Sequence, residues 1–114
     1  MKICMIGTGY VGLVSGACFS DLGNTVYCVD KDKTKIKLLN SGNIPIYEPG
    51  LEEIVKRNFN KKRLIFTDDL RTAIKNSKII FICVGTPTKK NSNKADLKYV
   101  FQVAKELKKS IKKY

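Results

Sequence analysis

Three glycines near the amino terminus have the spacing of a phosphate-binding turn. Residues 7–12 read GTGYVG, a GxGxxG sequence that directly follows a short apolar run and directly precedes an amphipathic one. Gly7 would permit a tight turn, Gly9 would let a pyrophosphate approach the backbone, and Gly12 would let helix and strand pack closely. We therefore expect unpaired N–H groups and the positive end of a helix dipole to hold the phosphates of a dinucleotide.

Asp30 is the acid expected to recognise the ribose of that dinucleotide. It follows the second apolar run, Thr25–Val29, and comes 18 residues after the last glycine of the turn. Its carboxylate would accept hydrogen bonds from the adenosine ribose and repel the 2′-phosphate of NADP, so NAD is the favoured cofactor. Lys31, Lys33 and Lys35 would offset part of that repulsion, which leaves a relaxed cofactor preference open.

The formal net charge of +12 raises the question of a nucleic-acid partner, but lysines along the whole chain supply nearly all of it. Aromatic residues are not interleaved with the lysine clusters as stacking platforms would be. We therefore expect a solvated surface and no nucleic acid, with a positive field that draws in anionic ligands. A free-standing Rossmann module that senses a nucleotide or contacts nucleic acid is the alternative from another class.

Cysteine and apolar patterning bear on metals and on the cellular compartment. The chain has no histidine, and its four cysteines form no CxxC pair, so the sequence predicts free thiols and no metal site. Cys4, Cys28 and Cys83 fall in predicted strands, where a thiol behaves as a small buried hydrophobe. No run approaches the roughly 18 apolar residues of a membrane helix, and the apolar start is too short for a signal peptide. We expect a cytoplasmic protein without a membrane partner.

Alternation of short apolar runs with longer amphipathic ones predicts an α/β fold. Right-handed crossovers would build a Rossmann-type doubly wound parallel sheet, truncated to about four strands in the order 3-2-1-4, with helices on both faces. The predicted strands are Lys2–Ile6, Thr25–Val29, Arg63–Thr67 and Lys78–Val84. The predicted helices are Tyr10–Leu22, Asp32 to Asn40 with Gly42 after it, Leu51–Asn58, Asp68 or Asp69 to Asn76, and one from Ala95 or Asp96 to Ile111. The continuous apolar run in the fourth strand predicts burial on both of its faces.

Three further segments resemble one known family, the UDP-glucose/GDP-mannose dehydrogenases. They are Ile46–Leu51, Val84–Thr88 and Ala95–Val100, which a generic Rossmann domain would not carry, and the Tyr-Val pair inside the glycine turn agrees with them. The resemblance implies that NAD is held by Gly7, Gly9, Tyr10, Val11 and Gly12 at the pyrophosphate, by Asp30 and Lys35 at the ribose, and by Thr86 at the inner cofactor. For Lys35 the alternative is that it is an ordinary solvated lysine in a lysine-rich helix. The loop at Tyr47–Leu51 is assigned no role in the site.

The resemblance also implies an activity that this chain would not perform alone. Family members oxidise the C6 alcohol of a nucleotide sugar in two NAD-dependent steps, and their cysteine nucleophile lies in later motifs. We expect residues 1–114 to be one NAD-binding domain without catalytic residues, lacking the later strands, the central helix and the sugar-binding domain, from a protein that is a homo-oligomer when complete. Tyr47 and the Gly-Thr-Pro-Thr segment favour UDP-glucose, while GDP-mannose and UDP-N-acetylhexosamine stay open. The basic stretch at Lys89–Lys94 departs from the family pattern. A third possibility is that the chain is a fragment without function, because its fourth strand would present an unpaired edge.

Overall fold

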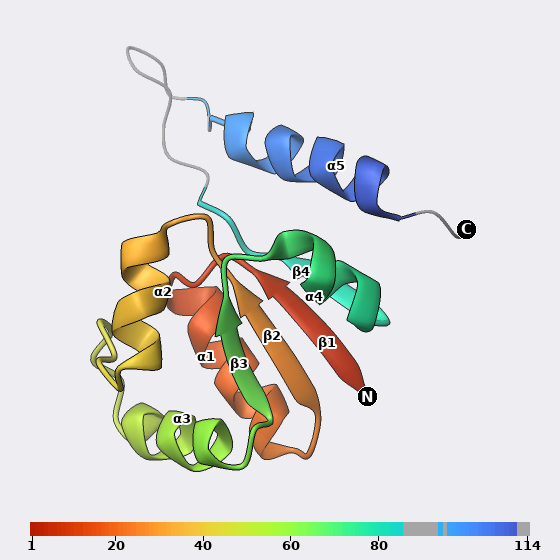
Figure 1. Ribbon diagram of the computed structural model, residues 1–114. Coiled ribbons are helices and arrows are strands. Elements are labelled where there is room, and N and C mark those ends of the chain that lie inside the picture. Colours follow the sequence, from red (N-terminus) through yellow and green to blue (C-terminus); the bar gives the residue numbers. More distant parts are fainter. Residues whose placement is uncertain (86–93, 95, 112–114) are drawn as a thin grey trace.

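A computed structural model describes residues 1–85, 94 and 96–111 and contains a parallel sheet flanked by helices (Figure 1). The four strands lie in the order β3-β2-β1-β4. Their bounds are β1 Lys2–Ile6, β2 Thr25–Val29, β3 Leu64–Thr67 and β4 Ile79–Ile82. The helices are α1 Tyr10–Asp21, α2 Lys33–Asn40, α3 Leu51–Asn60, α4 Leu70–Asn76 and α5 Lys98–Ser110. The predicted α/β fold and its strand order are confirmed.

Local signals place several of the helix ends. The Asp32 carboxylate accepts hydrogen bonds from two backbone N–H groups in the first turn of α2, and Asp69 accepts one in the first turn of α4. Such side-chain caps stabilise a helix by about 1 kcal/mol. Gly42 follows α2 with a φ of +89°, a backbone conformation that favours glycine. The capping acids and the terminating glycine therefore fix α2 and α4 as the sequence predicts.

The core has two parts, one on each face of the sheet, because alternate residues of β1 point in opposite directions. On one face Ile3 and Met5 pack with buried side chains of α1, α2 and α3. On the other face Cys4 and Ile6 pack with Ala73 of α4 and with the partly buried Val103 and Leu107 of α5. Helices on both faces are thus confirmed, although none of the residues of α5 is fully buried.

The prediction that the fourth strand is buried on both faces is wrong for the residues described. In β4, Ile79 is 40% exposed, Phe81 38% and Ile82 42%. Among the described residues β4 pairs only with β1, so it lies at the edge of the sheet with a neighbouring strand on one side. On the α1 side its cover includes Phe19, whose ring stacks on Phe81 at a centroid distance of 5.5 Å. An apolar run indicates which residues favour burial, but the position of a strand within the sheet determines how far they are buried.

The cysteines are free thiols, as predicted. Cys4 and Cys28 are buried, and burial raises the pKa of the Cys4 thiol to about 12. Cys83 follows β4 and is half-buried, which corrects its assignment to a fully buried strand position, and burial raises its pKa as well. No helix in the described part of the chain is long and apolar enough to cross a membrane.

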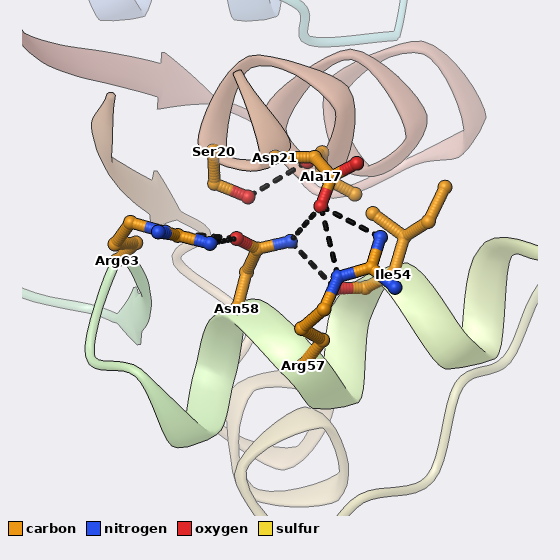
Figure 2. Close-up of polar contacts among 7 residues, drawn as sticks. All are labelled: Ala17, Ser20, Asp21, Ile54, Arg57, Asn58 and Arg63. Carbon is orange, nitrogen blue, oxygen red and sulfur yellow. Dashed lines mark hydrogen bonds and ion pairs between the residues drawn. The ribbon is translucent and has the colours of Figure 1, made fainter. Parts of the chain in front are cut away.

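A polar network ties α1, α3 and the start of β3 together (Figure 2). The fully buried Asn58 donates from its amide to Asp21 at 3.0 Å and to the Ile54 carbonyl at 2.8 Å. Its amide oxygen accepts two hydrogen bonds from the Arg63 guanidinium, at 3.0 and 2.8 Å. Arg57 donates to the same Asp21 oxygen at 2.8 Å. The network joins the end of α1, the last turns of α3 and the residue before β3, so it lies at the amino ends of the strands, away from the glycine turn.

Candidate functional site

The glycine turn sits at the carboxyl ends of three strands. Gly7 N–H donates to the carbonyl of Val29 at the end of β2, and Cys83 N–H donates to the carbonyl of Ile6 at the end of β1, both at 2.7 Å. β1 lies between β2 and β4, so the chain leaves it at the point where the strand order reverses. In open α/β sheets that point is where ligands bind.

Two of the three glycines are required by the chain itself. Gly7 has a φ of +107°, and a Cβ there would stand 2.6 Å from the Cys83 carbonyl oxygen. A Cβ on Gly12 would stand 1.9 Å from the Gly7 carbonyl oxygen. Gly9 differs, because its Cβ would meet nothing within 4 Å and its φ of −73° suits any residue. Nothing in the described part of the chain requires a glycine at this position, so the lack of a side chain at Gly9 matters only for a group from outside the chain.

The amino terminus of α1 opens onto a cavity of about 840 Å³. Gly9 is its N-cap and supplies no side-chain hydrogen bond, and the first turn holds no acid. The first N–H groups of a helix have no intrahelical acceptor, and the helix dipole makes this end positive. Tyr10 and Val11, in that first turn, are exposed and line the cavity. The geometry is that of an anion site formed by backbone.

Asp30 is joined to the glycine turn by hydrogen bonds from Thr8. Its Oδ2 accepts hydrogen bonds from Thr8 N–H at 3.1 Å and from the Thr8 hydroxyl at 2.7 Å, and its Oδ1 accepts from Asp32 N–H at 3.0 Å. A carboxylate has about four acceptor positions, so three are used and about one is left for a ligand hydroxyl. Burial alone would raise the pKa of Asp30, but these hydrogen bonds and the nearby Lys35 outweigh it and lower the pKa. The group is therefore an anion at neutral pH.

Lys35 stands beside Asp30, with its Nζ 3.8 Å from Asp30 Oδ2. The structure thus brings the two predicted ribose residues together at one wall of the cavity, which both of them line. Thr86, predicted for the inner cofactor, lies outside the described residues. Gly85, which precedes it, lines the same cavity close to the end of β4.

The sequence did not assign a role to two residues that the structure places at the site. Thr8 is fully buried and links the turn to Asp30, as described above. Glu48 belongs to the loop 43–50, and its Oε2 accepts a 2.6 Å hydrogen bond from the Tyr10 hydroxyl. The match of this loop to a family motif could have suggested a role for Glu48. Its contact with Tyr10 could not be predicted, because a contact between residues 38 positions apart leaves no pattern in a single sequence.

The loop also forms a second hollow, of about 530 Å³, lined by residues between Gly42 and Glu53. Tyr47 stands at this hollow and is 92% exposed. Gly50 turns the chain into α3 with a φ of +82°. The Tyr10–Glu48 hydrogen bond fastens this loop to the start of α1.

The described residues suit binding better than covalent chemistry. Cys83 is the cysteine that lines the cavity, and its raised pKa keeps it a protonated thiol rather than a nucleophilic thiolate. Backbone N–H groups, one anionic carboxylate and the ammonium of Lys35 can hold a phosphate and a hydroxyl. The arrangement fits a ligand that carries a pyrophosphate next to a ribose.

Comparison with known proteins points to one family. The model of the UDP-glucose/GDP-mannose dehydrogenase family, NAD binding domain, matches residues 1–114. The chain is 56% identical over 107 residues to a UDP-glucose 6-dehydrogenase of Rhizobium meliloti, and this match covers 94% of this chain and 24% of that protein. It is 55% identical over 106 residues to the UDP-glucose 6-dehydrogenase TuaD of Bacillus subtilis, and this match covers 93% of this chain and 23% of that protein.

The fold is also similar to solved structures. It superimposes with a TM-score of 0.89 on a GDP-mannose dehydrogenase from Pseudomonas aeruginosa, solved as a ternary complex, at 45% identity. The match covers 94% of this chain and 24% of that chain. This chain therefore spans about a quarter of the length of the relatives that it matches.

Proposed function

The chain belongs to the UDP-glucose/GDP-mannose dehydrogenase family, and we propose that it is the NAD-binding part of a nucleotide-sugar 6-dehydrogenase that converts UDP-glucose to UDP-glucuronate with two NAD. The observation that carries the proposal is the bare turn at Gly9, which opens at the amino terminus of α1 next to an anionic Asp30. The nicotinamide of bound NAD would supply the hydride acceptor. Residues of this chain bind and orient the cofactor.

The pyrophosphate takes its place against the turn. A pyrophosphate needs donors and close backbone approach, and the open space at Gly9 together with the N–H groups of Tyr10 and Val11 provides both. Gly7 and Gly12 act indirectly, because they let the turn and α1 adopt this geometry.

The adenosine ribose takes its place at Asp30. The acceptor position left on this carboxylate fits one ribose hydroxyl, and Lys35 holds the carboxylate in orientation from 3.8 Å. The negative charge of Asp30 disfavours the 2′-phosphate of NADP. Thr86, just beyond the end of β4, is proposed for the inner part of the cofactor.

The sugar and the wider setting are also proposals. UDP-glucose is preferred because the two relatives with more than half of their matched residues identical carry that activity in their names. GDP-mannose is the second candidate, supported by the structural match at 45% identity. We propose that residues 1–114 form a single cofactor domain of a longer cytoplasmic enzyme that assembles as a homo-oligomer and works without nucleic acid or membrane.

Calorimetric titration tests the proposal. NAD added to the 114-residue chain should bind, and UDP-glucose with NAD should give no NADH from this chain alone. Asp30→Ala should weaken NAD binding by at least tenfold, or about 1.4 kcal/mol, while circular dichroism shows an intact fold. A folded chain with no affinity for NAD, or one that binds DNA or RNA more tightly than NAD in a salt-sensitive way, would rule the proposal out.

A further inference from the structure

Three lysines follow Asp30 within five residues, and each has a partner in the structure. The Lys35 ammonium lies 3.8 Å from Asp30, and the Lys33 ammonium lies 3.8 Å from Asp68. The Lys31 ammonium stands over the ring of Tyr99 in α5, 4.2 Å from its centroid. Lys31 and Lys33 thus have partners other than Asp30, whereas Lys35 pairs with Asp30 itself.

Lys31 is the lysine that matters most for cofactor choice. It follows Asp30 directly and lines the same cavity. A 2′-phosphate next to the ribose needs a cation in reach, as NADP-binding Rossmann domains show with an arginine near this position. The ammonium of Lys31 is instead drawn to the α5 side of the cavity, where an aromatic face attracts a cation within about 6 Å.

Other groups that line the cavity act in the same direction. Asp68 of the β3–α4 connection and Glu106 of α5 line the cavity along with Tyr99, and both are acids. Their charges add to the repulsion that Asp30 exerts on a second phosphate. The Lys33–Asp68 pair contributes little, because the Lys33 side chain is 86% exposed and such pairs are weak.

We propose that Tyr99 is a specificity-determining residue that favours NAD over NADP by holding Lys31 away from the ribose. The inference rests on the proposed NAD site and adds to it a residue that lies 69 positions from Asp30 and on a different element. Asp30 supplies the repulsion. Tyr99 prevents the neighbouring lysine from cancelling it.

A matched pair of variants separates the ring from the hydroxyl of Tyr99. Tyr99→Phe keeps the aromatic face, so the ratio of the NADP and NAD dissociation constants should stay at the wild-type value. Tyr99→Leu keeps an apolar side chain on α5 but frees Lys31. The NADP/NAD ratio should then fall by about two- to fivefold, the value of an exposed cation–π contact, measured by calorimetry at low ionic strength.

The second step removes the lysine. Lys31→Ala in the Tyr99→Leu background should restore the wild-type ratio, whereas Lys31→Ala alone should leave the ratio unchanged. Equal ratios for Tyr99→Leu and Tyr99→Phe, with NAD binding retained, would overturn this inference and leave the proposed function standing. Loss of NAD binding from the wild-type chain would instead remove the proposed function, and this inference with it. A ratio measurement also excludes a general effect of Tyr99 on both cofactors.

Discussion

The Tyr10 hydroxyl donates a 2.6 Å hydrogen bond to the carboxylate of Glu48, joining the first residue of α1 to a loop 38 positions away. Tyr10 follows the bare glycine of the turn, so the bond connects the proposed pyrophosphate site to loop 43–50. This contact gives a physical role to a loop that the sequence matched to the family without an assignment. The loop helps to hold the start of α1 in place.

Removal of the Glu48 charge should change the titration of Tyr10. The hydrogen bond to Glu48 and the negative charge of that carboxylate raise the pKa of Tyr10, so Glu48→Gln should bring the pKa back toward the ordinary value near 10. Because a raised pKa stabilises the protonated fold, the benefit is complete below that ordinary value and is lost as the pH rises through the folded value. Ultraviolet titration of tyrosinate, with Tyr10→Phe to identify the signal, measures the shift. An unchanged Tyr10 titration in Glu48→Gln would show that the bond does not form in solution.

The glycines of the turn should separate into two classes. Gly12→Ala places a methyl group 1.9 Å from the Gly7 carbonyl oxygen and should destabilise the fold by about 3 kcal/mol or more. Gly9→Ala meets nothing in the chain, so its free energy of unfolding should stay within about 0.5 kcal/mol of wild type. Its affinity for NAD should nevertheless fall at least tenfold. Urea unfolding and calorimetry measure the two quantities, and a Gly9→Ala variant with wild-type NAD affinity would contradict the assignment.

Asp30 should make stability depend on pH on the acid side. Hydrogen bonds and Lys35 outweigh the effect of burial and lower its pKa in the fold. Its contribution is therefore present above the ordinary aspartate value near 3.9 and is lost as the pH falls through the folded value. The difference in unfolding free energy between wild type and Asp30→Asn should be larger at about pH 6 than at about pH 3. Asp68→Asn is the control for loss of a more exposed carboxylate, and an Asp30→Asn difference that is constant with pH would refute the expectation.

Asn58 should matter for stability and not for NAD. Asn58→Ala removes the hydrogen bonds that Asn58 makes with Asp21, Arg63 and the Ile54 carbonyl, while Asp21 keeps those from Arg57 (Figure 2). An unsatisfied buried group costs about 1–3 kcal/mol, so we expect a loss of about 3 kcal/mol in the free energy of unfolding. The exposed Asn76→Ala should cost under about 1 kcal/mol. Under conditions where it is folded, Asn58→Ala should bind NAD as wild type does, and a selective loss of NAD affinity would mean that the network reaches the site.

The helices, strands and strand order were predictable from the sequence, whereas contacts between distant side chains and the exposure of the edge strand were not. The strand–turn–helix at residues 2–12 and the capping acids Asp32 and Asp69 are set by neighbouring residues, which a single sequence displays. The bond from Thr8 to Asp30 spans 22 positions and depends on the pairing of β1 with β2. Phe81 is exposed because β4 is the edge strand, as the predicted order implies, whereas its apolar run taken alone predicted burial. The positions of Tyr99 and Glu48 at the site depend on packing between distant segments, which a single sequence does not display.

A crystal structure of the chain with NAD is the most direct measurement of the central claim. The pyrophosphate should lie against Gly9, within hydrogen-bond distance of the N–H groups that open α1, with a ribose hydroxyl on Asp30. Density for NAD elsewhere, or a turn whose mouth is filled by a side chain while NAD is present at saturating concentration, would contradict the claim that this backbone turn holds the dinucleotide.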